Sequence, residues 1–319
     1  MRAAWFLAFL FGFSWMAACK GGFIPIPIPN PIPPRPITAG TFNIRFDNPD
    51  DGPNAWPRRR AQVAAIIRSG DFWGLQEALP SQVADLRRDC PDMAFIVRTR
   101  DADPGSGESC PIAYRTATWA ADPEEQGTFW LSESPDVPGS RSWDAALPRI
   151  CTWARFVAPR STRALYVFNV HLDHRGSRAR LEAARMVAAR IAARRHPDPV
   201  IVLGDFNDGP GSGPLRALLG DPRIDLVDAW RAANAEAPEQ PTFNGWRDQP
   251  SGDRIDFILC SRSLPLAAAA IDLRRPDDRW PSDHAPVTAT FAGTVPWAHR
   301  SAEGPDSRAT TSAGPSARP

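Results

Sequence analysis

Lysine is almost absent from this sequence of 319 residues, in which Lys20 is the only one. Nearly all of the basic charge is therefore arginine. Together with abundant alanine and proline, this pattern indicates a GC-rich coding bias, so the number of arginines carries little functional information. Net charge is also small, at +1. A nearly neutral protein has no global attraction for DNA or anionic membranes, although a locally charged groove is compatible with this composition.

Long apolar runs are also absent. The longest, AAWFLAFLFGFSWMAA after Arg2, is shorter than the roughly 20 residues that span a bilayer. It predicts a secretory signal peptide over residues 1–19. Two alanines precede Cys19, as in a bacterial lipobox, where the cysteine is lipidated, but Met16 stands where leucine is usual. We expect an exported envelope protein anchored through a lipidated Cys19. The alternative is ordinary signal-peptidase cleavage, which would give a periplasmic or secreted protein.

Both ends of the chain are segments whose composition disfavours a place in a hydrophobic core. Within residues 20–36, seven prolines lie between Pro25 and Pro36. This spacing excludes helix and favours extended polyproline II, which predicts a semi-rigid linker. Residues 295–319 contain almost no strongly apolar side chains, which predicts a disordered tail. The folded domain is therefore expected over residues 37–294, a length that can bury a substantial core.

Cysteine is scarce as well, with five residues in the chain. Apart from the candidate lipidation site, they are Cys90, Cys110, Cys151 and Cys260. Their spacing matches no zinc motif. In an oxidising compartment Cys90 and Cys110 could pair across a loop, but sequence alone does not determine connectivity, so this pairing is left open.

Short apolar runs alternate with helical patterns early in the domain, and strands dominate later. Strands are predicted over 37–46, 71–77, 93–98, 127–132, 149–157, 164–172, 199–207, 254–260 and 269–274, and helices over 58–69, 81–89 and 177–195. In the last helix Ser177 is the expected N-cap, and the expected apolar face is Leu181, Ala184, Ala188 and Ile191. Many strands with few helices predict sheets packed face to face with helices outside, in one domain.

Polar side chains gather where several of these apolar strands end. They are Asn43, Gln76, Glu77, Asn169, His171, Asp205, Asn207, Asp283 and His284. Each has a structural explanation on its own: an Asx-turn for Asp205, a surface position or helix cap for Glu77, and a satisfied imidazole for His171. Asp283 beside an exposed His284 in a turn would be equally ordinary. Five such strand ends, and the cost of burying an unpaired carboxylate, nevertheless favour a functional cluster.

The chemistry of this set is that of phosphate ester hydrolysis. Oxygen ligands without thiolate suit Mg²⁺ or Mn²⁺, which meet phosphate oxygens through one or two carboxylates. Amides and imidazoles donate hydrogen bonds to phosphoryl oxygens as charge builds in the transition state. A histidine beside carboxylates can transfer protons. Together these residues are equipped for metal-assisted hydrolysis.

Seven motifs occur in order along residues 37–294: TFNIRFDNPDDGPNAWPRRR, LQE, FWLSESPDVPGSRSWDAALPRICTWARF, NVHLDH, GDFN, RIDFIL and SDHAPV. As an ordered set they resemble the endonuclease/exonuclease/phosphatase (DNase I-like) superfamily, and within it a bacterial subgroup. Other proteins of this superfamily are nucleases, inositol-polyphosphate 5-phosphatases, sphingomyelinases and deadenylases. The resemblance implies an α/β fold, a four-layered sandwich of two stacked mixed β-sheets flanked by helices, with an active site at one edge.

The resemblance also implies a metal site. Glu77 in LQE would be the principal metal ligand, with Asn43 in FNIR beside it. Asp283 in SDH would lie near the metal, either directly or through water. The implied cofactor is Mg²⁺, with Mn²⁺ as an alternative.

The remaining motif residues would act on the phosphate. His171 and Asn207 would contact the scissile phosphate and bind substrate, and Asp205 would orient or activate the attacking water. His284 would bond the phosphate or act as its acid–base partner, and Asp256 would fix the orientation of the His284 ring.

The chain departs from the superfamily pattern in one respect. Some nucleases carry an aspartate two residues after the first asparagine, whereas this chain has Arg45, which argues against a second metal contact and makes Arg45 a candidate substrate-binding residue. Arg149 and Arg155 are further candidates for a second phosphate, and Tyr114 for a position near the site, although arginine abundance and core packing explain them equally well. No basic, aromatic-rich insertion for gripping a duplex is evident.

These observations predict an exported, Mg²⁺-dependent phosphoesterase that is monomeric. Its partner would be a phosphate-ester substrate, with nucleic acid entering only as a substrate. One alternative is a nuclease acting on extracellular DNA or RNA, although the near-neutral charge disfavours it. Another alternative, from a different class, is a catalytically inactive envelope binding module. Phospholipid headgroups, inositol phosphates and sugar phosphates are not distinguished, because specificity lies in loops.

Overall fold

The computed structural model describes residues 35–159, 161 and 163–293. The predictions for the signal peptide (1–19), its lipidated Cys19, nearly all of the linker and the tail (295–319) lie outside these residues. Within the described part, no helix combines the length and apolarity needed to cross a membrane.

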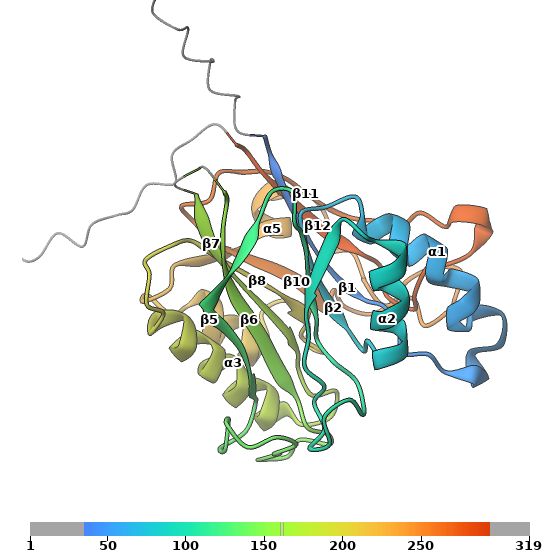
Figure 1. Cartoon of the computed structure of the whole chain (residues 1–319), viewed down its shortest axis with the longest axis horizontal. Helices are drawn as coiled ribbons and strands as arrows, with labels where there is room; N and C mark the ends of the chain where they lie inside the picture. The colour runs from blue at the N-terminus through green and yellow to red at the C-terminus, as the bar shows by residue number, and fades with distance from the viewer. Residues whose placement is uncertain (1–34, 160, 162, 294–319) are drawn as a thin grey trace, which may run out of the picture. The chain divides into compact units, whose positions relative to one another are not determined.

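The described chain forms two mixed sheets of six strands each (Figure 1). The first contains, in spatial order, β11 (Leu266–Ile271), β12 (Val287–Phe291), β1 (Ile37–Asn43), β2 (Phe72–Gln76), β4 (Ile112–Arg115) and β3 (Met93–Ile96). The second contains β5 (Ala120–Trp130), β6 (Ile150–Val157), β7 (Ala164–His171), β8 (Val200–Asp205), β10 (Asp256–Ser261) and β9 (Leu226–Asp228). β1 pairs with β2 and β7 with β8 in parallel, and the other pairs are antiparallel.

Helices cover the outer faces of both sheets. The longer ones are α1 (Trp56–Ile67) and α2 (Pro80–Asp89) beside the first sheet, and α3 (Ser177–Ala192) and α4 (Gly213–Leu219) beside the second (Figure 1). Short elements complete the fold: α5 (Ala229–Ala233) and the 3₁₀ segments η1 (Pro49–Asn54) and η2 (Pro276–Asp278). This is the predicted four-layered sandwich.

Strand alternation explains how the layers pack. On β7, Leu165 and Val167 face the first sheet and pack with residues such as Ile37 and Phe72. The intervening Tyr166 and Phe168 belong to the cluster that contains α3. Because successive side chains of a strand point to opposite faces, a strand that is buried on both sides reads as a continuous apolar run.

The N-cap prediction for α3 is wrong. Ser177 is the first helical residue, the N-cap position is Gly176, and the helix ends before the predicted residue 195. The carboxylate of Asp144, from the loop before β6, accepts hydrogen bonds from the second and third backbone N–H groups of the helix (3.2 and 2.7 Å). A residue distant in sequence therefore takes the role expected of the local serine. On the predicted apolar face, Leu181 is only partly buried.

The question of cysteine pairing has a structural answer. Cys90, Cys110, Cys151 and Cys260 are all buried and free. Cys90 packs beneath α1 and α2, whereas Cys110 packs against Trp130 and Ile150 in a separate cluster. A Cys90–Cys110 disulfide is therefore not formed. Burial raises the pKa of the Cys110 thiol to about 12, which makes it a poor nucleophile.

Candidate active site

The polar residues at strand ends converge at one edge of the two sheets. β1 and β2 are parallel, and their last residues, Asn43 and Gln76, are paired. In the second sheet, parallel β7 and β8 end on paired His171 and Asp205, and antiparallel β10 begins at Asp256, opposite Asp205. Asn43 Nδ2 donates a hydrogen bond to Asp205 Oδ2 (3.0 Å), which joins the two sheets at this edge.

Glu77 follows β2 directly, and two donors hold its carboxylate. Asn43 Nδ2 donates to Oε1 (3.0 Å), and the backbone N–H of Phe46 donates to Oε2 (3.2 Å). The backbone of Glu77 has φ 62°, a left-handed conformation that a non-glycine residue adopts only when its surroundings enforce it. Strained backbone and hydrogen bonds together fix a half-exposed carboxylate at the sheet edge, as a metal ligand requires.

Asp283 brings a second carboxylate to this place from the segment before β12. Ser282 Oγ donates to Asp283 Oδ1 (3.2 Å), and Arg45 Nε lies 3.8 Å from Oδ2. Burial raises the pKa of Asp283, and the negative charge of Glu77 adds to the effect. Since like charges disfavour the ionised form, a bound cation would stabilise both carboxylates.

His284 is held between two carboxylates. Its Nδ1 lies 2.9 Å from Asp256 Oδ2, and its Nε2 lies 3.8 Å from Asp205 Oδ2. Burial alone would lower the pKa of His284, but the negative charges of Asp256 and Asp205 outweigh it and raise that pKa well above its usual value. Burial, reinforced by Asp256, raises the pKa of Asp205 to about 7. The trio therefore combines a charged imidazole with a carboxylate that can exchange protons near neutral pH.

His171 has the opposite electrostatic environment. Its Nε2 lies 3.5 Å from Asp205 Oδ2, the same oxygen that His284 Nε2 faces. Burial lowers the pKa of His171 well below its usual value, and the positive charges of Arg149 and Arg100 lower it further. The site thus has one neutral and one charged imidazole, both directed at Asp205. Their different surroundings suit them to different roles.

Asp205 makes the Asx-turn that the sequence allows, with Asn207 as the donor. The backbone N–H of Asn207 donates to Asp205 Oδ1 (2.9 Å), and its Nδ2 donates to the Leu172 carbonyl (3.0 Å). Its φ of 50° is left-handed, a conformation that asparagine tolerates better than most residues. The turn occupies only Oδ1 of Asp205, so Oδ2 still faces the histidines. The turn and the functional interpretation are therefore compatible.

The donors at this edge fit a hard divalent cation. Glu77 and Asp283 offer carboxylate oxygens, the ligand type that Mg²⁺ and Mn²⁺ prefer. Asn43 turns its amide nitrogen toward Glu77, and its Oδ1 accepts the Arg45 N–H (3.0 Å), so in this arrangement it orients the Glu77 carboxylate. A second group of buried ligand atoms, all within 4.8 Å of one another, is formed by Asp205, Asp256 and His284. Among the described residues, Asp256 Oδ1 has no hydrogen-bond partner. Hard-cation ligands are therefore present on both sides of the Asn43–Asp205 hydrogen bond.

The structure places the other candidate residues as follows. Arg45 reaches the site margin, but its guanidinium makes two hydrogen bonds to Asp51, both of 3.0 Å. Arg155 pairs with Asp198 (2.7 Å) and with Asp122 (3.0 Å), so it is a structural ion-pair residue. Tyr114 packs on Phe156 with ring centroids 4.9 Å apart, which places it in the core rather than the site.

Gln76 and Asn169, two of the strand-end residues, hold the sheets together instead of facing substrate. Both are fully buried, and Gln76 Nε2 donates to Asn169 Oδ1 (2.8 Å). Asn169 Nδ2 then donates to the carbonyls of Leu75 and Pro111, each at 2.8 Å. These contacts pair most of the buried polar groups between the sheets just behind the site, although Gln76 Oε1 has no hydrogen-bond partner among the described residues.

Arg59 is not among the site residues predicted from the sequence, but it organises the metal end of the site. Its side chain is fully buried on α1. The guanidinium donates to the Arg45 carbonyl (2.7 Å), the Asn54 carbonyl (2.8 Å), the Pro281 carbonyl (3.3 Å) and the Ile44 carbonyl. It thereby ties the segment after β1 to the segment that carries Asp283. The sequence feature that could have pointed to Arg59 is the run PRRR at the start of α1, in which one of the three arginines lies on the buried face of the helix.

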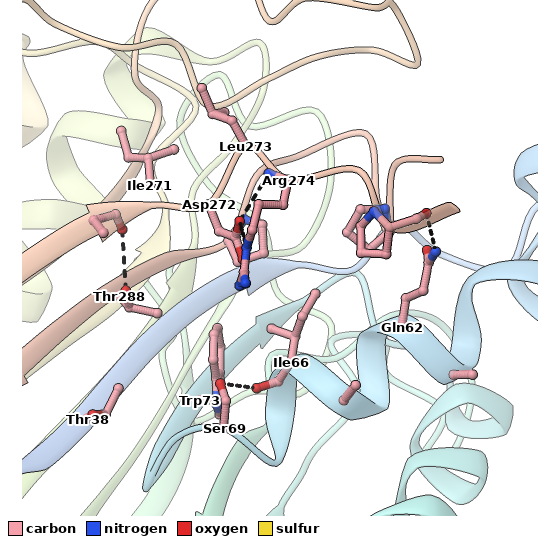
Figure 2. A pocket seen from close by; sticks show the side chains of 16 residues that line it. Thr38, Gln62, Ile66, Ser69, Trp73, Ile271, Asp272, Leu273, Arg274 and Thr288 are labelled. Carbon is pink, nitrogen blue, oxygen red and sulfur yellow. Dashed lines mark hydrogen bonds and ion pairs between the residues drawn. The ribbon is translucent and has the colours of Figure 1, made fainter. Parts of the chain in front are cut away.

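A larger groove of about 1080 Å³, between α1 and the paired strands β11 and β12, is lined by none of the carboxylates or histidines of the sheet edge (Figure 2). Its lining is mostly apolar, with Ile66, Trp73 and Leu273 among the side chains. The carboxylate in this lining, Asp272, is bound by Arg274 at 2.6 and 2.8 Å. Its lining thus lacks the paired acids and imidazoles of the sheet edge, so we place the chemistry at the edge.

The loop after β7 yields a prediction on acid stability. Burial alone would raise the pKa of Asp173, but four backbone N–H donors, among them Gly176 and Ala146, outweigh it and lower the pKa to about 2. A depressed carboxyl pKa contributes stability above the unfolded-state value near pH 4, which is lost as pH falls toward 2. The free energy of unfolding, measured with urea, is expected to fall between pH 6 and pH 2.5 in both proteins. The fall should be about 1–2 kcal/mol smaller in Asp173→Asn than in wild type. Equal losses in both proteins would contradict this account of the loop.

Two six-stranded mixed sheets between helices, with carboxylates, amides and imidazoles at one edge, define a DNase I-like protein. The chain belongs to the Endonuclease/Exonuclease/phosphatase family, whose sequence profile matches residues 40–284. Members of this family are hydrolases that act on phosphoester bonds.

Individual relatives agree with this assignment. A family member from Bacteroides vulgatus has a TM-score of 0.75 and 32% identity, over 80% of this chain and 98% of that chain. The mannosyl-6-phosphatase Bt3783 of Bacteroides thetaiotaomicron has a TM-score of 0.71 and 30% identity, over 80% and 99%. YbhP of Escherichia coli strain K12 is 30% identical over 150 residues, 46% of this chain and 54% of that protein. The chain spans about half the length of the curated relatives it matches.

Proposed function

We propose that this chain is a metal-dependent phosphoesterase that hydrolyses a phosphate ester by in-line attack of water. One observation carries the proposal: metal-ligand donors at the end of the first sheet meet Asp205, Asp256 and His171 of the second sheet, and His284, from the segment before β12, lies against them. The hydrogen bond between Asn43 and Asp205 (3.0 Å) marks the point where they meet. A structural core would not place four carboxylates and two imidazoles together at a sheet edge without a compensating ligand.

Glu77 and Asp283 would hold the metal, and Asn43, whose Nδ2 donates to Glu77, would hold that carboxylate in place beside it. When bound, Mg²⁺, or Mn²⁺ in its place, polarises a phosphoryl oxygen and offsets the charge that builds on it. His284 Nδ1 lies 2.9 Å from Asp256 Oδ2, and the negative charges of Asp256 and Asp205 raise the pKa of His284, which favours the protonated imidazole. This favours the Glu77 side for the cation, because a protonated imidazole cannot ligate a metal.

Asp205 of the second sheet and His284, from the segment before β12, supply the proton transfers. Asp205, with a pKa of about 7, accepts a proton from the attacking water, whose oxygen bonds to phosphorus as the ester P–O bond breaks. Charged His284, oriented by Asp256, gives a proton to the departing ester oxygen. Neutral His171 and Asn207 stay on the phosphate and hydrogen-bond its free oxygens as charge develops.

Location and substrate complete the proposal. Export through residues 1–19, anchoring at a lipidated Cys19 and a monomeric state rest on the sequence patterns given above. A small phosphate ester is favoured as substrate by similarity to a mannosyl-6-phosphatase at 30% identity. A nucleic-acid substrate is less favoured, because a net charge of +1 supplies little of the electrostatic attraction on which such binding depends.

Metal removal and a metal-ligand variant test the proposal together. The full chain is expected to hydrolyse aryl phosphates with Mg²⁺, to lose this activity in EDTA and to regain it when Mg²⁺ is restored. Glu77→Gln should weaken Mg²⁺ binding, measured by isothermal titration calorimetry, by at least about tenfold. Glu182→Gln is the matched control, since Glu182 pairs with Arg185 (2.9 Å) on the exposed face of α3. Full turnover in EDTA, or an unchanged Mg²⁺ affinity in Glu77→Gln, would refute the proposal.

A further inference from the structure

Arg149 is a buried cation with unused donors at the catalytic edge. It directly precedes β6, and only 5% of its surface is exposed. Its Nη2 meets His174 Nδ1 (3.0 Å), but Nε and Nη1 have no hydrogen-bond partner among the residues that the structure describes. A buried guanidinium with two unused donors is costly unless an anion or a water satisfies them.

The neighbouring carboxylates do not meet this need. Asp173 Oδ2 lies 3.6 Å from Arg149 Nε, beyond hydrogen-bond distance, and already accepts backbone N–H groups from Ala146 (3.0 Å) and Leu147 (3.2 Å). Glu108 binds Arg100 through two hydrogen bonds of 2.7 and 2.9 Å. Arg149 is therefore left with an incompletely satisfied positive charge in a buried place.

A small cavity separates Arg149 from the catalytic cluster. Its volume is about 10 Å³, and it is lined by Arg100, Glu108, Ser109, Cys110, Arg149, Ile150 and His171. The Glu108 carboxylate in this lining is neutralised by its pairing with Arg100, so Arg149 is the incompletely paired charge that faces the cavity. A cavity of this size holds about one water-sized atom. His171 also lies 3.5 Å from Asp205, so the cavity adjoins the residues that act on the phosphate. One oxygen of a phosphate bound at His171 would fit there, and a larger group would not.

We propose that Arg149 binds a free phosphoryl oxygen of the substrate in this cavity, and that this contact selects phosphate monoesters over diesters. This inference rests on the proposed phosphoesterase function and names its substrate class. A diester has one free oxygen fewer than a monoester, and its second ester substituent is too large for a cavity of one-atom size. Arginine suits this role because its planar guanidinium offers several donors to a phosphate.

The test compares a monoester with a diester in the full chain at saturating Mg²⁺. Wild type should prefer p-nitrophenyl phosphate to bis-(p-nitrophenyl) phosphate in kcat/KM. Arg149→Gln should lower kcat/KM for the monoester by about 100-fold, the effect of losing one donor to a charged transition state, and for the diester by less than about tenfold. Arg149→Lys, which keeps the charge but not the fork, should restore part of the monoester activity. Arg185→Gln, on the exposed side of α3, is the control and should change neither.

A binding measurement separates this inference from the proposed function. Inorganic phosphate, titrated calorimetrically into Mg²⁺-loaded protein, should bind wild type at least about tenfold more tightly than Arg149→Gln. Equal phosphate binding, or equal losses on both esters, would overturn the role of Arg149. Absence of metal-dependent turnover on both esters, with phosphate binding that still depends on Arg149, would instead refute the catalytic proposal alone. If Arg149→Gln is unfolded by circular dichroism, the same comparisons in Arg149→Lys decide.

Discussion

His284→Ala is expected to lower kcat by about 10²–10⁴-fold, the usual contribution of a general acid or base. The imidazole lies 2.9 Å from Asp256 and 3.8 Å from Asp205, so it connects the two carboxylates. Its removal deletes the proton donor and leaves two buried carboxylates facing one another. Turnover of an aryl phosphate at saturating Mg²⁺ measures the effect directly.

Asp256 refines this prediction. Asp256→Asn keeps the shape of the side chain but removes the negative charge that holds the His284 ring protonated. The activity of this variant should lie between wild type and His284→Ala, because the imidazole remains but loses its orienting charge. His196→Ala is the control. The backbone N–H of His196 donates to Tyr166 Oη (3.4 Å), near the end of β7 opposite to His171. Wild-type kcat in His284→Ala, with an unchanged fold, would show that the site is assigned wrongly.

Arg59→Ala is expected to destabilise the protein by about 3 kcal/mol or more, since it leaves several buried carbonyls without donors at a cost of about 1–3 kcal/mol each. The carbonyls affected include those of Arg45 and Pro281, which lie on the two segments around the metal end. For a domain of this size the melting temperature should fall by about 6–12 °C. Calorimetry or thermal circular dichroism measures both quantities.

Arg58→Ala provides the matched control for Arg59→Ala. Arg58 is the preceding residue on the same helix, but it is exposed. Its substitution should change stability by less than about 0.5 kcal/mol. Similar melting temperatures in Arg58→Ala and Arg59→Ala would contradict the assigned role of Arg59. Arg59→Lys should recover only part of the stability, because one ammonium group cannot span carbonyls on both segments.

Much of the fold could be predicted, but not its shorter parts. Strands such as β7 and β8 are buried on both faces and read as unbroken apolar runs, so the sequence identifies them. β4 (IAYR) and β9 (LVD) are not predicted, because they are too short to show a period; β3 is equally short but continues into the longer apolar run MAFIV. β12 (VTATF), in which two threonines alternate with buried residues, is not predicted either. These three strands are recognised only through their pairing partners.

The candidate site shows the same division. Asn169 and His171 are two residues apart on β7, and therefore lie on the same face of the strand. The sequence treats them as equivalent polar strand-end residues. In the structure Asn169 bonds carbonyls between the sheets, whereas His171, at the last position of the strand, faces Asp205. Two residues along the strand separate a core position from a position in the candidate site, and no local sequence pattern marks that boundary.

The sequence by itself determined the residue types that can act on a phosphate, their order along the chain and the strands that end on them. These properties are local, because each depends on neighbouring residues and on strand period. Only the tertiary structure decided which of these residues meet. The bond from Asn43 to Asp205 joins positions 162 apart, and the bond from Ser282 to the Asn43 carbonyl joins positions 239 apart. Contacts over such separations depend on how the two sheets stack, which no segment of sequence encodes alone.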